Sequence, residues 1–210
     1  FEGREAEHSG SGFIVSFTSA GKAVESALAI GAEIPRKVRE ATRIKIAVNA
    51  GEPVENSSRF FGDTIELANL LCAVNREGTV AISNQVKEII ARDPALHRSP
   101  ELFSLPPQDE NLISLLFKKL EENWQDPDFD ISDYCQAMAM SKSQLYRKAM
   151  SITGLSPNLL LKEFRLEKAR ELLKKKRYNI AQITFDSGFT SPSYFTKCFK
   201  KKYGLLPMAY

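Results

Sequence analysis

The sequence predicts an α+β protein in two parts: a partial α/β sandwich over residues 1–92 and an all-α domain over residues 110–210. Three observations support this division. Strand-like and helix-like segments alternate in the first part, every periodic segment after Glu110 is helical, and a Pro-rich stretch over 93–109 separates the parts. With 210 residues, 43% of them hydrophobic and 26% charged, the chain has enough apolar content for buried cores.

Short apolar segments at 13–17, 44–48 and 79–83 predict the strands of the first part. Helices are predicted between them. One begins after Ser19, whose side chain can cap it, and another opens at Asp63 in a capping-box pattern. A short helix is expected after the last strand.

Prolines dominate the stretch 93–109, in the pairs Asp93–Pro94, Ser99–Pro100 and Pro106–Pro107. Proline removes a backbone donor and biases the residue before it towards extended conformations. This stretch is predicted to be a linker, or an irregular strand leading into one.

The last third of the chain contains two helix-turn-helix patterns about fifty residues apart. Each has a short helix, a small residue that breaks it, and a Ser that caps a second helix: Ile131, Ala139 and Ser141 in the first, Ile180, Gly188 and Ser191 in the second. Such a motif can place its second helix in the major groove of DNA. Two motifs on one chain can read two groove faces without a dimer.

A long helix is predicted between the two motifs. Ser156 is a good N-cap and Pro157 suits the first helical position, and the apolar period then continues to about Lys175. A helix of that length is roughly 30 Å long, close to one turn of B-DNA at about 34 Å. It can therefore hold two reading helices in successive major grooves.

Charge is distributed unevenly along the chain. Residues 139–210 contain 15 Lys and Arg against 4 acidic residues, whereas residues 1–108 contain 12 against 14. A helical domain with solvated lysines would have the same composition. The coincidence of the basic segment with both motifs favours a surface that meets phosphates.

From about Glu110 to Tyr210 the sequence resembles the AraC family of bacterial transcription regulators. The residues that carry the resemblance are Met140–Ser141, Leu145–Tyr146–Arg147, Gly154–Leu155–Ser156, Arg165 to Leu173, Ile183, Gly188–Phe189, Ser191, Tyr194–Phe195, Phe199–Lys200–Lys201, Gly204 and Pro207. Three small residues depart from the family pattern. Cys135 and Thr184 replace Ala at the helix crossings, and Ala139 replaces a turn Gly.

The resemblance implies double-stranded DNA as a partner and assigns roles to exposed residues of each second helix. Base-reading positions would be Ser143, Tyr146, Arg147, Ser193, Thr196 and Lys197. Phosphate-binding positions would be Lys142, Lys148, Lys200, Lys201 and Lys202. Arg147 could pair with guanine O6 and N7, whereas surface packing is an equal alternative for Tyr146.

Residues 3–91 resemble the class III adenylate and guanylate cyclase domain, which implies a ferredoxin-like sandwich. The matching segments are 8–17, 23–30, 44–54, 61–68 and 78–83. The positions that carry the family's chemistry are changed. Ser11 stands where a metal-binding Asp is expected, Glu7 and Arg59 replace base-recognising residues, and Glu66 and Leu70 replace an Asn and an Arg of the catalytic motif. These changes predict a domain without catalytic residues, metal or cofactor.

The expected role is therefore a cytoplasmic transcription regulator whose first part is an inactive sensor or dimerisation unit. A small molecule or nucleotide effector and a homodimer are implied, and no membrane association is expected. The alternatives are a nucleotidyl cyclase completed by a partner subunit, or a nucleotide-binding sensor. Three separated cysteines, Cys72, Cys135 and Cys198, are predicted to be buried thiols.

Overall fold

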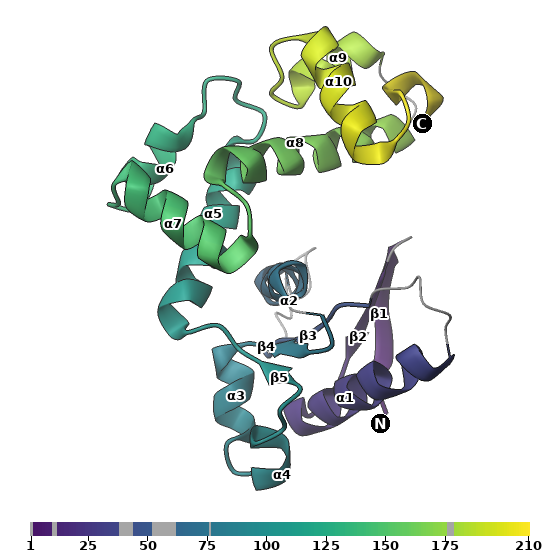
Figure 1. The fold of residues 1–210 in the computed structure, drawn as a ribbon. Helices are drawn as coiled ribbons and strands as arrows, with labels where there is room; N and C mark the ends of the chain where they lie inside the picture. The colour runs from purple at the N-terminus through teal and green to yellow at the C-terminus, as the bar shows by residue number, and fades with distance from the viewer. Residues whose placement is uncertain (1, 10–11, 38–43, 52–61, 76, 176–178) are drawn as a thin grey trace. The chain divides into compact units, whose positions relative to one another are not determined.

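The computed structural model describes residues 2–9, 12–37, 44–51, 62–75, 77–175 and 179–210. The chain divides into two compact units, Phe1–Ser114 and Leu115–Tyr210 (Figure 1). In the described ranges, no helix combines the length and the apolar character that crossing a bilayer requires.

The first unit opens with an antiparallel hairpin. Strand β1 (Arg4–Ser9) pairs with strand β2 (Gly12–Ser16), with an irregularity between Glu5 and Glu7. Only β2 was expected from its apolar sequence. Phe13 on β2 is 70% exposed, so the hairpin does not contribute that ring to the unit's core.

A second, parallel sheet lies at the centre of the first unit's core. Its strands are β3 (Ile46–Val48), β4 (Val80–Ile82) and β5 (Leu102–Phe103), in the order β3-β4-β5. The middle strand is fully buried, as expected for a strand covered on both faces. Helix α1 (Ala20–Lys37) precedes β3, α2 (Gly62–Val74) lies between β3 and β4 in the sequence, and α3 (Asn84–Ile90) follows β4. Residues of α1, β4 and α3 form one hydrophobic core together with Leu96: Val24, Ala27, Val80, Ile82, Val86 and Ile90.

The predicted strands and helices of this unit are present, but their assembly was predicted less well. Ser19 accepts a hydrogen bond from the Lys22 N–H at 3.4 Å, as its capping role requires. A ferredoxin-like sandwich places its strands in one sheet of βαββαβ order. In the described ranges, the strands form two separate sheets. The cyclase-like sandwich is therefore not confirmed and stays a prediction.

The segment 93–109, predicted as a linker or as an irregular strand leading into one, is largely folded and includes a short strand. It contains α4 (Pro94–His97) and the paired strand β5, and it buries Leu96 and Leu105. Two of the prolines begin helices instead of interrupting the chain. Pro94 begins α4 and Pro107 begins α5 (Pro107–Asn123), and proline is well tolerated in a first helical turn, where its missing N–H would have had no partner.

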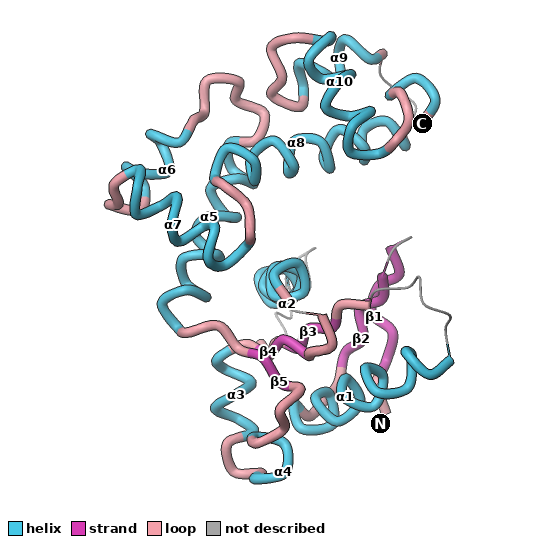
Figure 2. Tube along the Cα trace, in the orientation of Figure 1, coloured by secondary structure: helices cyan, strands magenta, loops and turns pink. Residues whose placement is uncertain are grey.

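The second unit is helical, as predicted (Figure 2). After the last part of α5 come α6 (Ile131–Ala137), α7 (Lys142–Thr153), α8 (Pro157–Lys174), α9 (Ile180–Asp186) and α10 (Pro192–Tyr203), then a 3₁₀ turn at Pro207–Ala209. Figure 1 shows α8 as a rod that joins the α6–α7 pair to the α9–α10 pair. We call these pairs the first motif and the second motif.

Helix α8 contributes buried residues along its whole length. Leu160 and Leu161 are buried near its start. Its later turns add Leu166, Ala169 and Leu173 to a core with Ile183, Phe189, Phe195 and Phe199 of the second motif. The three cysteines are free thiols and only half-buried, not fully buried as predicted. Burial nevertheless raises the pKa of the Cys72 thiol.

Candidate nucleic-acid interface

Both helices of the first motif begin at side-chain caps. The Asp130 carboxylate accepts from the Ser132 N–H, and Asp133 accepts in return from the Asp130 N–H at 2.7 Å. At the start of α7, Ser141 Oγ accepts from the Gln144 N–H at 3.3 Å, and Gln144 Oε1 accepts from the Ser141 N–H at 2.9 Å. These reciprocal bonds satisfy N–H groups that a helix start leaves open. They fix the register of α7.

The second motif repeats this construction. Asn179 and Gln182 form the capping box of α9, and Ser191 Oγ accepts from the Tyr194 N–H at 3.3 Å. Both second helices end at a left-handed glycine, Gly154 after α7 and Gly204 after α10. The two predicted motifs are thus confirmed, with the same start and stop signals about fifty positions apart.

The turns inside the two motifs use different residues for the same backbone conformation. Ala139 has φ +49° and Gly188 has φ +72°. An L-residue with a side chain is strained in this region, whereas glycine is not. A Cβ on Gly188 would also overlap the carbonyl oxygen of Trp124, so only glycine fits the second turn.

Helix α7 separates a buried face from an exposed one. Leu145, Ala149 and Ile152 are buried. The predicted base-reading residues Ser143, Tyr146 and Arg147 are all exposed, three and four positions apart, and therefore share the opposite side of the helix. Tyr146 is 50% exposed, so half of its surface stays available to a partner.

Helix α10 has the same division. Phe195 and Phe199 are fully buried. Ser193 and Lys197 are exposed, and Thr196 is half-buried. Five of the six predicted base-reading side chains are therefore exposed, and the sixth is half-buried.

Tyr194 was missed as a candidate. Its ring is 52% exposed on α10, whereas the residue at the same position of α7, Gln144, is used by its capping box. A hydrogen bond with the Cys198 thiol raises the pKa of the Tyr194 hydroxyl. The available signal was a large aromatic residue at a helical position next to the predicted reading face.

The predicted phosphate-binding lysines fall into two groups. Lys142, Lys200 and Lys201 are exposed, and Lys148 is half-buried. Lys202 is used inside the domain instead: its Nζ lies 2.9 Å from the Glu163 carboxylate and donates to the Glu163 carbonyl at 3.0 Å. It also lies 5.2 Å from the Tyr203 ring centroid. This ammonium ties α10 to α8, which differs from the phosphate role expected for it.

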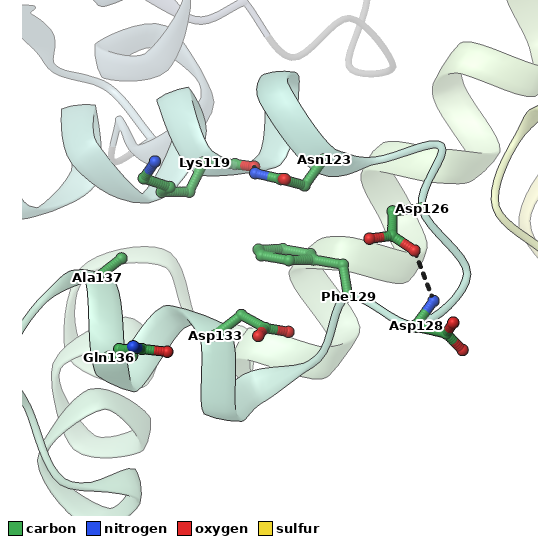
Figure 3. A pocket seen from close by; sticks show the side chains of 8 residues that line it. All are labelled: Lys119, Asn123, Asp126, Asp128, Phe129, Asp133, Gln136 and Ala137. Carbon is green, nitrogen blue, oxygen red and sulfur yellow. Dashed lines mark hydrogen bonds between the residues drawn. The ribbon is translucent and has the colours of Figure 1, made fainter.

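A shallow cavity of about 380 Å³ lies beside the first motif (Figure 3). It is lined by Lys119, Asn123, Asp126, Asp128, Phe129, Asp133, Gln136 and Ala137. The Asp126 carboxylate accepts from the Asp128 N–H at 3.0 Å. Its acidic side chains outnumber its single lysine, so this hollow does not suit a phosphate backbone. Across the described ranges, no three carboxylate, thiol or imidazole groups are placed to hold a metal ion.

The altered cyclase positions are only partly visible. The side chains of Glu7, Ser11 and Arg59 lie outside the described residues, as does that of Asp63. Glu66 and Leu70 both lie on α2, the first exposed and the second half-buried. Of the altered cyclase positions, the structure therefore describes the side chains of Glu66 and Leu70 alone.

Part of the second unit matches a known protein family. Residues 134–210 match the helix-turn-helix domain family. Histidine kinase P4 of Formosa agariphila is 36% identical over 116 residues, which cover 55% of this chain and 8% of that protein. The transcriptional regulator MtrA of Neisseria gonorrhoeae is 34% identical over 100 residues, 48% of this chain and 32% of its own. The chain therefore spans less than a third of the length of these relatives.

Among solved structures, the C-terminal domain of the response regulator yesN from Fusobacterium nucleatum is 28% identical, with a TM-score of 0.46. The match covers 48% of this chain and 97% of that domain. The family match over residues 134–210 covers most of the first capped motif and all of the second. The family match over residues 134–210 and the two capped motifs agree that the C-terminal half of the chain contains a helix-turn-helix domain.

Proposed function

We propose that this protein is a sequence-specific transcription regulator that binds double-stranded DNA through α7 and α10. One observation carries the proposal: each second helix is capped, packed on one face and open on the other. The open faces present Ser143, Tyr146 and Arg147 on α7, and Ser193 and Lys197 on α10. The relative MtrA is itself named as a transcriptional regulator.

Arg147 is the residue best suited to read a base. Its guanidinium can donate two parallel hydrogen bonds to guanine O6 and N7, worth about 1–3 kcal/mol of discrimination. Lys197, with one flexible ammonium, gives a less directional contact. Tyr146 and Thr196 supply apolar surface and hydroxyl groups beside them. We extend this proposed reading face to Tyr194, because its exposed ring adjoins Ser193.

The phosphate contacts fall to Lys142, Lys148, Lys200 and Lys201, which flank the reading residues. They supply affinity without sequence information, and they release counterions when DNA binds. Lys202 is left out of this set because Glu163 already neutralises its ammonium.

Helix α8 sets the separation of the two reading helices. Its 18 residues give a length of about 27 Å at about 1.5 Å per residue. One turn of B-DNA is about 34 Å. The two second helices can thus occupy successive major grooves on one side of the duplex, so that a single chain contacts a bipartite site.

The first unit is proposed to be a cyclase-like sensor or dimerisation unit without catalytic activity, in a cytoplasmic protein. Leu70 cannot stabilise negative charge in a transition state, and Glu66 would repel a triphosphate. A small molecule or nucleotide bound there, or pairing of two first units in a homodimer, would change DNA binding by favouring one arrangement of the DNA-binding domains.

Selection from a random pool of duplexes tests the proposal directly. The whole chain is expected to enrich a bipartite sequence whose two halves are about one helical turn apart. Enrichment of no sequence at moderate salt would refute sequence-specific binding. Assays of cyclic nucleotide formation from ATP and GTP with Mn²⁺ test the first unit separately, and turnover above that of buffer would contradict its inactive role.

A further inference from the structure

The loop between α5 and α6 touches the second motif as well as the first. Arg165, in the middle of α8, donates from Nε to the Trp124 carbonyl at 2.8 Å and from Nη2 to the Asp126 carbonyl. Gln125 Nε2 donates to the Asp186 carbonyl at 3.2 Å, at the end of α9. Three consecutive loop residues are therefore bonded to α8 or α9, across 39 to 61 positions of sequence.

Gly188, in the turn of the second motif, lies against the same loop and the same arginine. A Cβ there would meet the Trp124 carbonyl oxygen and would lie 2.7 Å from Arg165 Nε. The turn of the second motif thus lies directly against the loop that leads into the first. We name this contact the intermotif clasp and define it as Trp124, Gln125, Asp126, Arg165, Asp186 and Gly188.

The clasp is partly withdrawn from water. Arg165 is half-buried, and burial lowers the pKa of its guanidinium. Gly188 is fully buried. Opening this contact would leave the half-buried Arg165 guanidinium and the two carbonyl oxygens without their hydrogen-bond partners. A charged donor bonded in this way is therefore held more firmly than an exposed ion pair.

We infer that Arg165 is a positioning residue that fixes the angle between the two motifs, and through it the spacing of the two reading helices. Helix α8 sets their separation along its axis, but a single helix can still bend or twist between the two motifs packed on its ends. The clasp joins the loop before α6 to the turn after α9, off the axis of α8, and so restrains this motion. This inference depends on the proposed function for its DNA consequence, but not for its structural one.

The structural consequence is tested without DNA, in the full chain. The three cysteines are changed to Ser, spin labels are placed by Ser151→Cys on α7 and Ala181→Cys on α9, and the distance distribution is measured by double electron–electron resonance. Arg165→Met is expected to widen the distribution at least twofold. Arg170→Met is the matched control, because Arg170 is also an arginine of α8 but contacts Glu167 of the same helix and the Tyr203 ring of α10, and neither of these contacts reaches the first motif. It is expected to leave the width unchanged.

The DNA consequence is tested with selected duplexes in which the two half-sites are moved apart or together by one base pair. The unmodified chain is expected to lose about tenfold in affinity with either change. Arg165→Met should bind the best spacing about fivefold more weakly and should discriminate between spacings by less than twofold, while Arg170→Met keeps the full preference. An unchanged distance distribution together with an unchanged spacing preference in Arg165→Met would overturn the inference.

Arg165→Lys keeps the test decisive if Arg165→Met does not fold. Lysine retains the charge but has one donor group, which can satisfy only one of the two carbonyls well. An intermediate widening and an intermediate loss of spacing preference are expected, and a wild-type profile would count against the clasp. If the unmodified chain selects no DNA at all, the proposed function fails, while the distance measurement still decides the role of Arg165.

Discussion

Exchanging the turn residues of the two motifs should have opposite effects on stability. Ala139 adopts φ +49° although it has a side chain. The left-handed conformation costs a residue with a Cβ about 1–2 kcal/mol relative to glycine. Ala139→Gly removes this strain, but it also gives the unfolded chain more freedom, which costs about 0.4–1 kcal/mol. The net expectation is a gain of about 0.5–1 kcal/mol in the free energy of unfolding.

The reverse exchange, Gly188→Ala, should be strongly destabilising. It introduces the same backbone strain at φ +72° and places a Cβ against the Trp124 carbonyl, a backbone atom that cannot rotate away. Overpacking of this kind adds about 1–3 kcal/mol. We therefore expect a loss of about 2–4 kcal/mol in the free energy of unfolding, several times larger than the gain at Ala139.

Trp124 makes the measurement specific to the second unit. It is the one tryptophan of the chain, so urea unfolding followed by its fluorescence reports on that unit. Ala137→Gly serves as the control, because Ala137 is the last residue of α6 and has no left-handed strain to relieve. This change should lower the free energy of unfolding by up to about 1 kcal/mol. If Ala139→Gly proved as destabilising as this control, the strain assigned to the first turn would be refuted.

Three further predictions concern single side chains of the second unit. Arg147→Ala should reduce the sequence preference at one base pair by about 1–3 kcal/mol. Lys201→Ala should weaken binding to all duplexes alike and lower the slope of log K against log salt by about 1. Identical binding profiles for the two variants would contradict the assigned roles. Lys202→Ala should lower the free energy of unfolding by about 1 kcal/mol, because its bonds to Glu163 are lost. The slope of log K for DNA binding against log salt should stay unchanged, and a reduced slope would show that Lys202 binds a phosphate. Tyr134→Phe should leave the free energy of unfolding unchanged or raise it by up to about 1 kcal/mol, because this buried hydroxyl has no hydrogen-bond partner among the described residues. If urea unfolding showed a loss above about 1 kcal/mol, the Tyr134 hydroxyl would have a hydrogen-bond partner after all.

The helix boundaries of the second unit could be predicted because their causes are local. Ser141 and Ser191 cap helices through bonds to residues three positions away, and glycine at 154 and 204 ends them through its own backbone freedom. The exposed sides of α7 and α10 follow from helical spacing in the same way. Such signals are readable from a short window of sequence.

The features that were missed depend on contacts between distant parts of the chain. The partner of Lys202 lies 39 positions away, and the parallel pairing of β3, β4 and β5 joins segments that the sequence separates widely. Pro94 and Pro107 were ambiguous because proline both interrupts structure and begins helices. The clasp around Arg165 could not be inferred, because nothing local indicates which carbonyls a half-buried arginine will meet.

A chemical footprint of the full chain on a selected duplex tests the central claim most directly. The account predicts two protected major-groove patches, on one face of the duplex and about 10 base pairs apart. It also predicts that N7 of the guanine opposite Arg147 is protected from methylation. A single protected patch, or uniform protection that ignores sequence, would contradict the claim that one chain reads DNA with two helices.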